Sequence, residues 1–135
     1  MYMKEEIKNL LNRLLWSIMK DSQAGIYNAF NDEDVDEAQY QFDYGLYALT
    51  ELKHLNNGEK VDFENISMAL ESAIPNEDNL KDRIKVMLDY GFSKEKDNLI
   101  DFTKDELENG IVKETYELYH PSDELIDELV ELFNK

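Results

Sequence analysis

The chain has 135 residues and a formal net charge of -17, because 31 Asp and Glu residues outnumber 14 Lys and Arg residues. Such an acidic chain repels nucleic-acid phosphates and anionic lipid headgroups, which argues against direct binding to DNA, RNA or a membrane surface. The sequence contains no cysteine, so disulfides, thiolate metal sites and thiol catalysis are excluded.

The length and the apolar content are those of one folded domain over residues 1–135. A chain of this size can bury a real core, and 42% hydrophobic and 11% aromatic residues are typical of a folded protein. The first residues lead directly into a charged helical pattern without the apolar region of a signal peptide. No apolar run approaches the roughly 20 residues of a membrane span. We therefore expect a cytoplasmic protein.

Helical periodicity begins in the first residues. Over residues 3–20, apolar side chains recur on one face of a helix, and the same face extends as far as Phe30. The pattern agrees with one bent helix or with two shorter helices that separate near Asp21 and Ser22. The face consists of Ile7, Leu10, Leu11, Leu14, Leu15 and Ile18.

A second helix is predicted over residues 33–55, and Asn57 with Gly58 follows its end. Apolar residues on one side of this helix form a stripe that we expect to face the core. The stripe consists of Val35, Ala38, Phe42, Leu46, Leu49 and Leu52.

The rest of the chain is also predicted to be helical. Asp62 is placed to cap a short helix, Gly91 to end the next one, and Ser122 to cap the last one. A further helix is predicted over residues 103–119, where Thr103 and Glu106 have the spacing of a capping box. No segment shows the sustained alternation of a strand. The predicted fold is an all-α, compact array of about six amphipathic helices in a single domain.

The acidic residues are distributed unevenly along the chain. Residues 32–51 contain seven acids and no base, and residues 101–135 contain eleven acids and three bases, whereas residues 1–31 are nearly neutral. Two segments therefore carry most of the negative charge.

Three tyrosines lie on the second predicted helix, opposite its apolar stripe. They follow the spacing i, i+4 and i+7, and carboxylates surround them on the same side. Unpaired carboxylates resist burial, whereas tyrosine and acids together suit an interface with a basic partner. The alternative is a central helix whose tyrosines pack beneath a neighbouring helix. The predicted partner-binding residues are Glu33, Asp36, Tyr40, Asp43, Tyr44, Tyr47 and Glu51.

Other chemistry finds little support in the sequence. Residues 32–36 have the D-x-D-x-D opening of a calcium loop, but Glu37 and Asp43 occupy the positions that need Gly and Glu. Paired acids such as Glu124 and Asp127 suggest an all-α, magnesium-dependent nucleotide pyrophosphohydrolase, although phosphate-binding bases are sparse nearby. We predict no catalytic residue, no metal site and no cofactor.

The sequence favours a small protein inhibitor that binds and occludes a basic, nucleic-acid-handling partner. Two settings agree with this prediction: immunity to a nuclease toxin, and a phage protein directed against a bacterial defence system such as a CRISPR effector. In general character the chain resembles the acidic, helical immunity proteins of nuclease bacteriocins, although no motif of that family matches it residue by residue. The alternatives are the pyrophosphohydrolase and a non-catalytic oligomerising adaptor.

Overall fold

The computed structural model describes the backbone of residues 3–100 and 121–135 and the side chains of residues 3–91 and 121–135. Within these ranges the chain forms five helices and no strand, which confirms the all-α class. The prediction of about six helices differs slightly from the five that the described residues form, and the helix predicted over residues 103–119 lies outside them. The helices are α1 (Glu5–Asn31), α2 (Val35–Asn56), α3 (Phe63–Ala73), α4 (Leu80–Ile100) and α7 (Asp123–Phe133).

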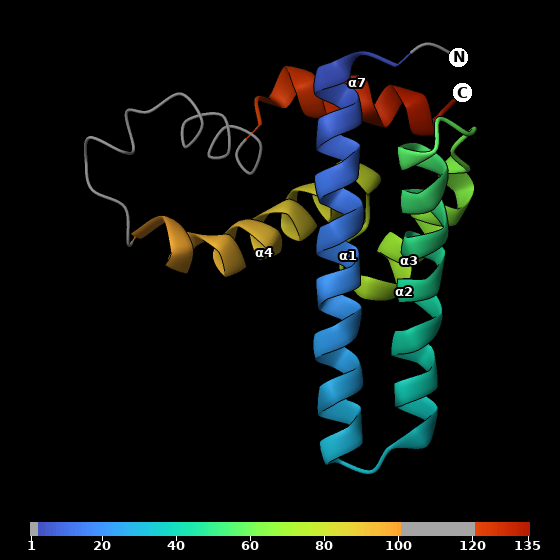
Figure 1. The fold of residues 1–135 in the computed structure, drawn as a ribbon, viewed down its shortest axis with the longest axis vertical. Coiled ribbons are helices and arrows are strands. Elements are labelled where there is room, and N and C mark those ends of the chain that lie inside the picture. The colour runs from blue at the N-terminus through green and yellow to red at the C-terminus, as the bar shows by residue number, and fades with distance from the viewer. Residues whose placement is uncertain (1–2, 101–120) are drawn as a thin grey trace.

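α1 and α2 form a long antiparallel hairpin (Figure 1). α1 is one continuous helix of 27 residues, so the alternative of two shorter helices that separate near Asp21 and Ser22 is wrong. The Ser22 hydroxyl donates a hydrogen bond of 2.6 Å to the Gln41 carbonyl of α2, so this side chain joins the two helices.

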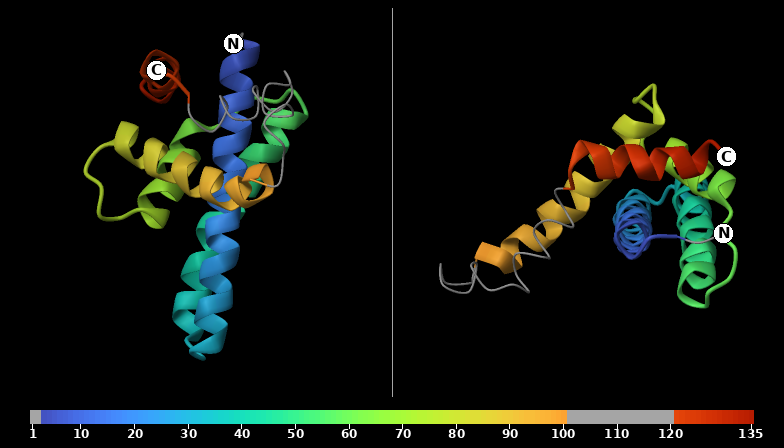
Figure 2. Two further views of the ribbon diagram at one scale, coloured as in Figure 1. Left: turned by 90° about the vertical axis from the view of Figure 1, so that its left-hand side faces the viewer. Right: turned by 90° about the horizontal axis from the view of Figure 1, so that it is seen from above.

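The other helices lie on one side of the hairpin, and they cover only the half that contains the start of α1 and the end of α2 (Figure 2). The core lies where all five helices meet, and its fully buried side chains include Leu10, Leu14, Ile66, Met87 and Leu129. The backbone of the other half of the hairpin extends beyond α3, α4 and α7 (Figure 1), although the Tyr40 side chain still reaches Ser72 of α3. We call this half, residues 21–46, the arm.

Side-chain caps fix where three helices begin. Asp62 accepts hydrogen bonds from the Glu64 and Asn65 amides, and Ser122 accepts one from the Leu125 amide, so both predicted caps are confirmed. α2 begins two residues later than predicted, because Asp34 is its cap.

Two predicted helix ends were placed incorrectly. Glu33 does not belong to α2, because it adopts a left-handed φ of 55° in the turn before that helix. Gly91 was predicted to end a helix, but it is a buried residue inside α4, which continues to Ile100.

Candidate functional site

α2 is rotated relative to the orientation that its apolar stripe predicted. Tyr44 is only 2% exposed and belongs to the core, whereas Val35, at the start of the predicted core stripe, is 79% exposed. Phe42 and Leu46 of the same stripe are also exposed. The buried face of α2 contains Tyr44, Ala48, Glu51, Leu52 and Leu55.

Small residues explain this rotation, because they allow α1 and α2 to approach closely. A Cβ atom added to Gly45 would lie 2.2 Å from the Ser22 Oγ and 2.7 Å from the Ser22 Cβ. A Cβ atom added to Gly25 would lie 2.0 Å from the Gln41 Oε1. The Ser22 contact leaves no room for a larger side chain at Gly45, whereas at Gly25 the nearby atoms belong to the end of the flexible Gln41 side chain, which can move. Phe42 and Leu46 of the predicted stripe are therefore left on the outside of the hairpin.

The Tyr44 hydroxyl lies in a polar cluster inside the hairpin. It is 2.5 Å from the Asp21 Oδ2 and 2.5 Å from the Gln41 Oε1, and it donates to the Asp21 carboxylate. Burial, followed by the hydrogen bond to Asp21, raises the pKa of the Tyr44 phenol. Tyr40 packs edge-on against Tyr44, and its own hydroxyl donates to the Ser72 carbonyl of α3 at 2.8 Å. Two of the three tyrosines therefore hold the hairpin to itself and to α3.

Glu51 is a fully buried carboxylate with a complete set of partners. Its Oε1 accepts from the Asp62 amide at 2.8 Å, and its Oε2 accepts from the Asn65 Nδ2 at 2.9 Å. The His54 Nδ1 lies 2.8 Å from the Oε1 atom. The carboxylate therefore joins the end of α2 to the start of α3, since buried charges are tolerated where donors satisfy them.

His54 makes the stability of this junction depend on pH. The hydrogen bond to Glu51 raises the pKa of His54 above its ordinary value. A raised folded-state pKa gives stability that is complete below the unfolded pKa of about 6.5 and is lost as the pH rises through the folded-state pKa. Between about pH 6 and about pH 9 we expect the urea midpoint of the wild-type protein to fall more than that of His54→Gln. Equal losses in the two proteins would contradict this role, because His120 is present in both.

The seven predicted partner-binding residues do not form one surface. Tyr44 and Glu51 are inside the fold, so the prediction that they face a partner directly disagrees with their burial. The remaining residues are exposed, and any partner-binding role for them stays a prediction. These residues are Glu33, Asp36, Tyr40, Asp43 and Tyr47.

Large apolar side chains are exposed on α1 and α2, most of them in the arm. Of the ten large apolar side chains that are exposed among the described residues, eight belong to α1 and α2. The most exposed of those on α1 is Phe30, at 77%. Six of them lie in the arm, and Trp16 and Tyr47 lie outside it. Of the eight, the sequence predicted only Tyr40 and Tyr47 as surface residues. The eight are Trp16, Tyr27, Phe30, Val35, Tyr40, Phe42, Leu46 and Tyr47.

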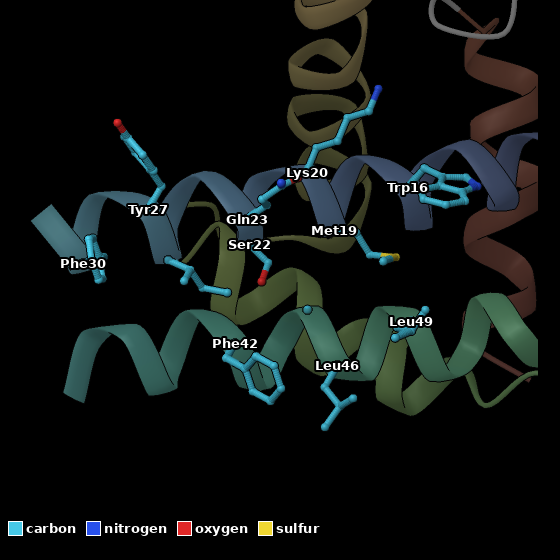
Figure 3. Close-up of a pocket in the computed structure, with 12 residues that line it drawn as sticks. Trp16, Met19, Lys20, Ser22, Gln23, Tyr27, Phe30, Phe42, Leu46 and Leu49 are labelled. Atoms are coloured by element: carbon cyan, nitrogen blue, oxygen red, sulfur yellow. The ribbon is translucent and has the colours of Figure 1, made fainter. Parts of the chain in front are cut away.

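An open groove of about 840 Å³ runs between α1 and α2, and its lining is almost entirely apolar. Figure 3 shows side chains of both helices along it, with Trp16 toward one end and Phe30 toward the other. Among the residues that line it, the charged side chain is Lys20. The main apolar contributors are Trp16, Met19, Ile26, Tyr27, Phe30, Phe42, Leu46 and Leu49.

An acidic turn closes the arm beyond Phe30. Asp32, Glu33 and Asp34 form this turn, and Asp36 and Glu37 follow in the first turn of α2; all five are exposed. No Lys, Arg or His occurs anywhere in residues 21–52. The end of the arm therefore presents concentrated negative charge beside an apolar groove.

The acids of α7 are used differently, because two of them form ion pairs with α4 and a third pairs with Lys4, the residue before α1. The Lys85 ammonium holds the pKa of Asp123 below its usual range. The pairs join Lys81 to Asp127 at 2.8 Å, Lys85 to Asp123 at 3.0 Å and Lys4 to Glu128 at 3.3 Å. Part of the charge in the second acidic segment therefore serves the docking of α7.

Within residues 3–91 and 121–135, His, Asp and Glu side chains do not gather in threes in a way that would hold a metal ion. Of the described helices, none is both long enough and apolar enough to cross a bilayer. Comparisons with protein-family models, with curated proteins and with solved structures find no match for this chain.

Proposed function

We propose that this protein is a stoichiometric inhibitor that binds a basic, nucleic-acid-handling protein and covers the surface which that partner uses for phosphates. The observation that carries the proposal is the composition of the arm, where exposed aromatic and aliphatic side chains lie beside an acidic turn. Immunity to a nuclease toxin and phage counter-defence are the two settings in which such a protein would act.

The apolar side chains of the arm supply the contact energy for this function. Exposed apolar patches of this kind mark interaction surfaces, and aromatic residues dominate the affinity of protein interfaces. Tyr27 and Phe30 stand out because they are highly exposed although they lie on α1, the helix that supplies much of the core. A helix end without a partner would not need these bulky residues.

The acidic turn supplies attraction and selectivity. Carboxylates attract a basic surface over several ångströms, speed the encounter and pair with the Lys and Arg residues that otherwise hold phosphates. In residues 21–52 no base of the chain itself competes for these carboxylates, whereas three acids of α7 are already paired. The arm is therefore the better candidate for the inhibitory surface.

Reversing two charges on the arm tests this proposal. The partner is captured from the native host with the tagged chain, then purified and titrated with wild-type protein. We expect a 1:1 complex that weakens as salt rises and that releases an oligonucleotide from the partner. Asp36→Lys with Asp43→Lys should weaken the complex by about tenfold to a hundredfold, because two attractive charges become repulsive.

Glu124→Lys with Glu131→Lys is the matched control, since it makes the same charge change on exposed residues of α7. Its effect should stay within about threefold, the size expected of distant, screened charges. Equal weakening by both pairs would show that only the net charge matters. A partner that keeps its oligonucleotide in the complex would show that the protein is no inhibitor of this kind.

A further inference from the structure

We propose that the groove between α1 and α2 receives one amphipathic α-helix of the basic partner, with apolar residues against the groove and Lys or Arg beside the acidic turn. This inference rests on the proposed function and names the chemistry of the partner surface. It is carried by the periodicity, the length and the charge polarity of the groove.

The groove has the periodicity of an interface between helices. On α1, Trp16, Met19, Gln23, Ile26 and Phe30 line it at steps of three or four residues. Side chains at this spacing form a ridge along one face of a helix. When two helices pack together, the ridge of one fits into the groove between the ridges of the other. α1 and α2 already supply two of the three walls that a three-helix arrangement needs.

α2 completes the groove in the same way. Phe42, Leu46 and Leu49 line its side at steps of four and three residues. Gly45 lies between them and contributes no side chain, which keeps the floor of the groove low where α2 meets Ser22 of α1. An apolar side chain of an inserted helix would contact both α1 and α2 at this level.

The length of the groove also suits a helix better than a compact ligand. Fourteen residues separate Trp16 from Phe30 on α1. At a rise of about 1.5 Å per residue they span about 21 Å, or roughly four helical turns. A partner helix of similar length would cover the whole apolar lining.

The two ends of the groove differ in charge. Beyond Phe30 lies the acidic turn, whereas beyond Leu49 the same ridge of α2 continues with the exposed Lys53 and with Asn56, whose side chain hydrogen-bonds to Asn12 of α1. Basic residues at one end of a partner helix would therefore meet carboxylates, and its apolar face would meet the groove. This complementarity favours a basic helix over a second copy of the chain, whose net charge is -17.

A designed peptide tests the inference without a known partner. The probe is a labelled amphipathic peptide of about 18 residues, with leucines on one face, lysines at one end and no tryptophan. The full chain is titrated with it and two signals are followed, the anisotropy of the label and the fluorescence of Trp16. Trp16 is the single tryptophan of the chain, so its emission reports on the groove. We expect binding with a blue shift of the Trp16 emission as the indole leaves water.

Substitutions in the groove should weaken this binding, whereas a substitution outside the groove should not. Leu46→Glu and Phe42→Glu should each lower the affinity for the peptide by at least about tenfold, because each places a carboxylate in an apolar contact. Met68→Glu adds the same charge to an exposed apolar position of α3 outside the groove, and it should change the affinity by less than about twofold. A permuted peptide, whose leucines no longer share one face, should not shift the Trp16 emission. Thermal melting followed by circular dichroism checks that each variant is folded.

Three results would overturn the inference. Peptide binding with unchanged Trp16 emission, or equal effects of Leu46→Glu and Met68→Glu, would place the peptide elsewhere on the acidic surface. A dimer of the chain that Leu46→Glu dissociates would make a second copy the occupant. None of these results decides the proposed function, because that function is tested separately, with Asp36 and Asp43 of the arm and with a captured partner.

Discussion

Replacing Glu51 by alanine should lower the free energy of unfolding by about 3 kcal/mol, because removing one partner from a buried, hydrogen-bonded charged cluster is costly. The substitution leaves the Asp62 amide and the Asn65 side chain without their acceptor. It also creates a cavity at the junction of α2 and α3. Urea unfolding followed by circular dichroism measures the loss.

Two further variants separate the hydrogen bonds from the general effect of removing an acid. Glu51→Gln keeps one carbonyl acceptor but turns the other oxygen into a donor, so we expect a loss of about 1–2 kcal/mol. Glu59→Ala removes an exposed acid next to this junction and should change stability by less than about 0.5 kcal/mol. If Glu51→Ala and Glu59→Ala had equal effects, the carboxylate would not hold the two helices together.

The positions of the helices were largely predictable from local patterns. Asp62 and Ser122 begin α3 and α7 as expected, since an N-cap is a local interaction between a side chain and nearby amides. Gly91 was misread because glycine after an apolar pattern usually ends a helix. In this protein the glycine is buried within α4, and burial depends on packing with distant parts of the chain.

The rotation of α2 could not be read from hydrophobic periodicity, because two faces of this helix are apolar. One face contains Phe42 and Leu46, and the other contains Tyr44 and Ala48. The choice between them depends on how closely α1 approaches, and therefore on which small residues meet across the hairpin. Gly45 was the available signal, since a glycine inside a helix usually has a packing reason.

The negative charge of the candidate site could be predicted from the sequence, but the apolar groove could not. The acids of residues 32–37 are exposed as expected, because charge segregation is visible in a sequence. The groove beside them arises from side chains that the periodicity had assigned to the core. Glu51 was expected at the surface for a sound physical reason, yet the Asp62 amide and Asn65, both on the next segment, satisfy it inside the fold.

The close approach of α1 and α2 predicts a strong coupling between Gly45 and Ser22. Gly45→Ala should lower the free energy of unfolding by about 2 kcal/mol, because overpacking outweighs the gain of about 1 kcal/mol in helix propensity. The new methyl group would meet the Ser22 Cβ, which belongs to a side chain too short to move away. Denaturant unfolding measures the change.

A second substitution should restore most of this loss. Ser22→Gly alone removes the hydrogen bond to the Gln41 carbonyl and should cost about 1–2 kcal/mol. In the double variant the glycine and the larger residue exchange helices, which makes room for the methyl group. Its stability should lie within about 1 kcal/mol of the wild-type protein, so the two changes are coupled by at least about 2 kcal/mol. Additive losses would show that the helices separate easily, and that small residues do not set the rotation that places Phe42 and Leu46 in the groove.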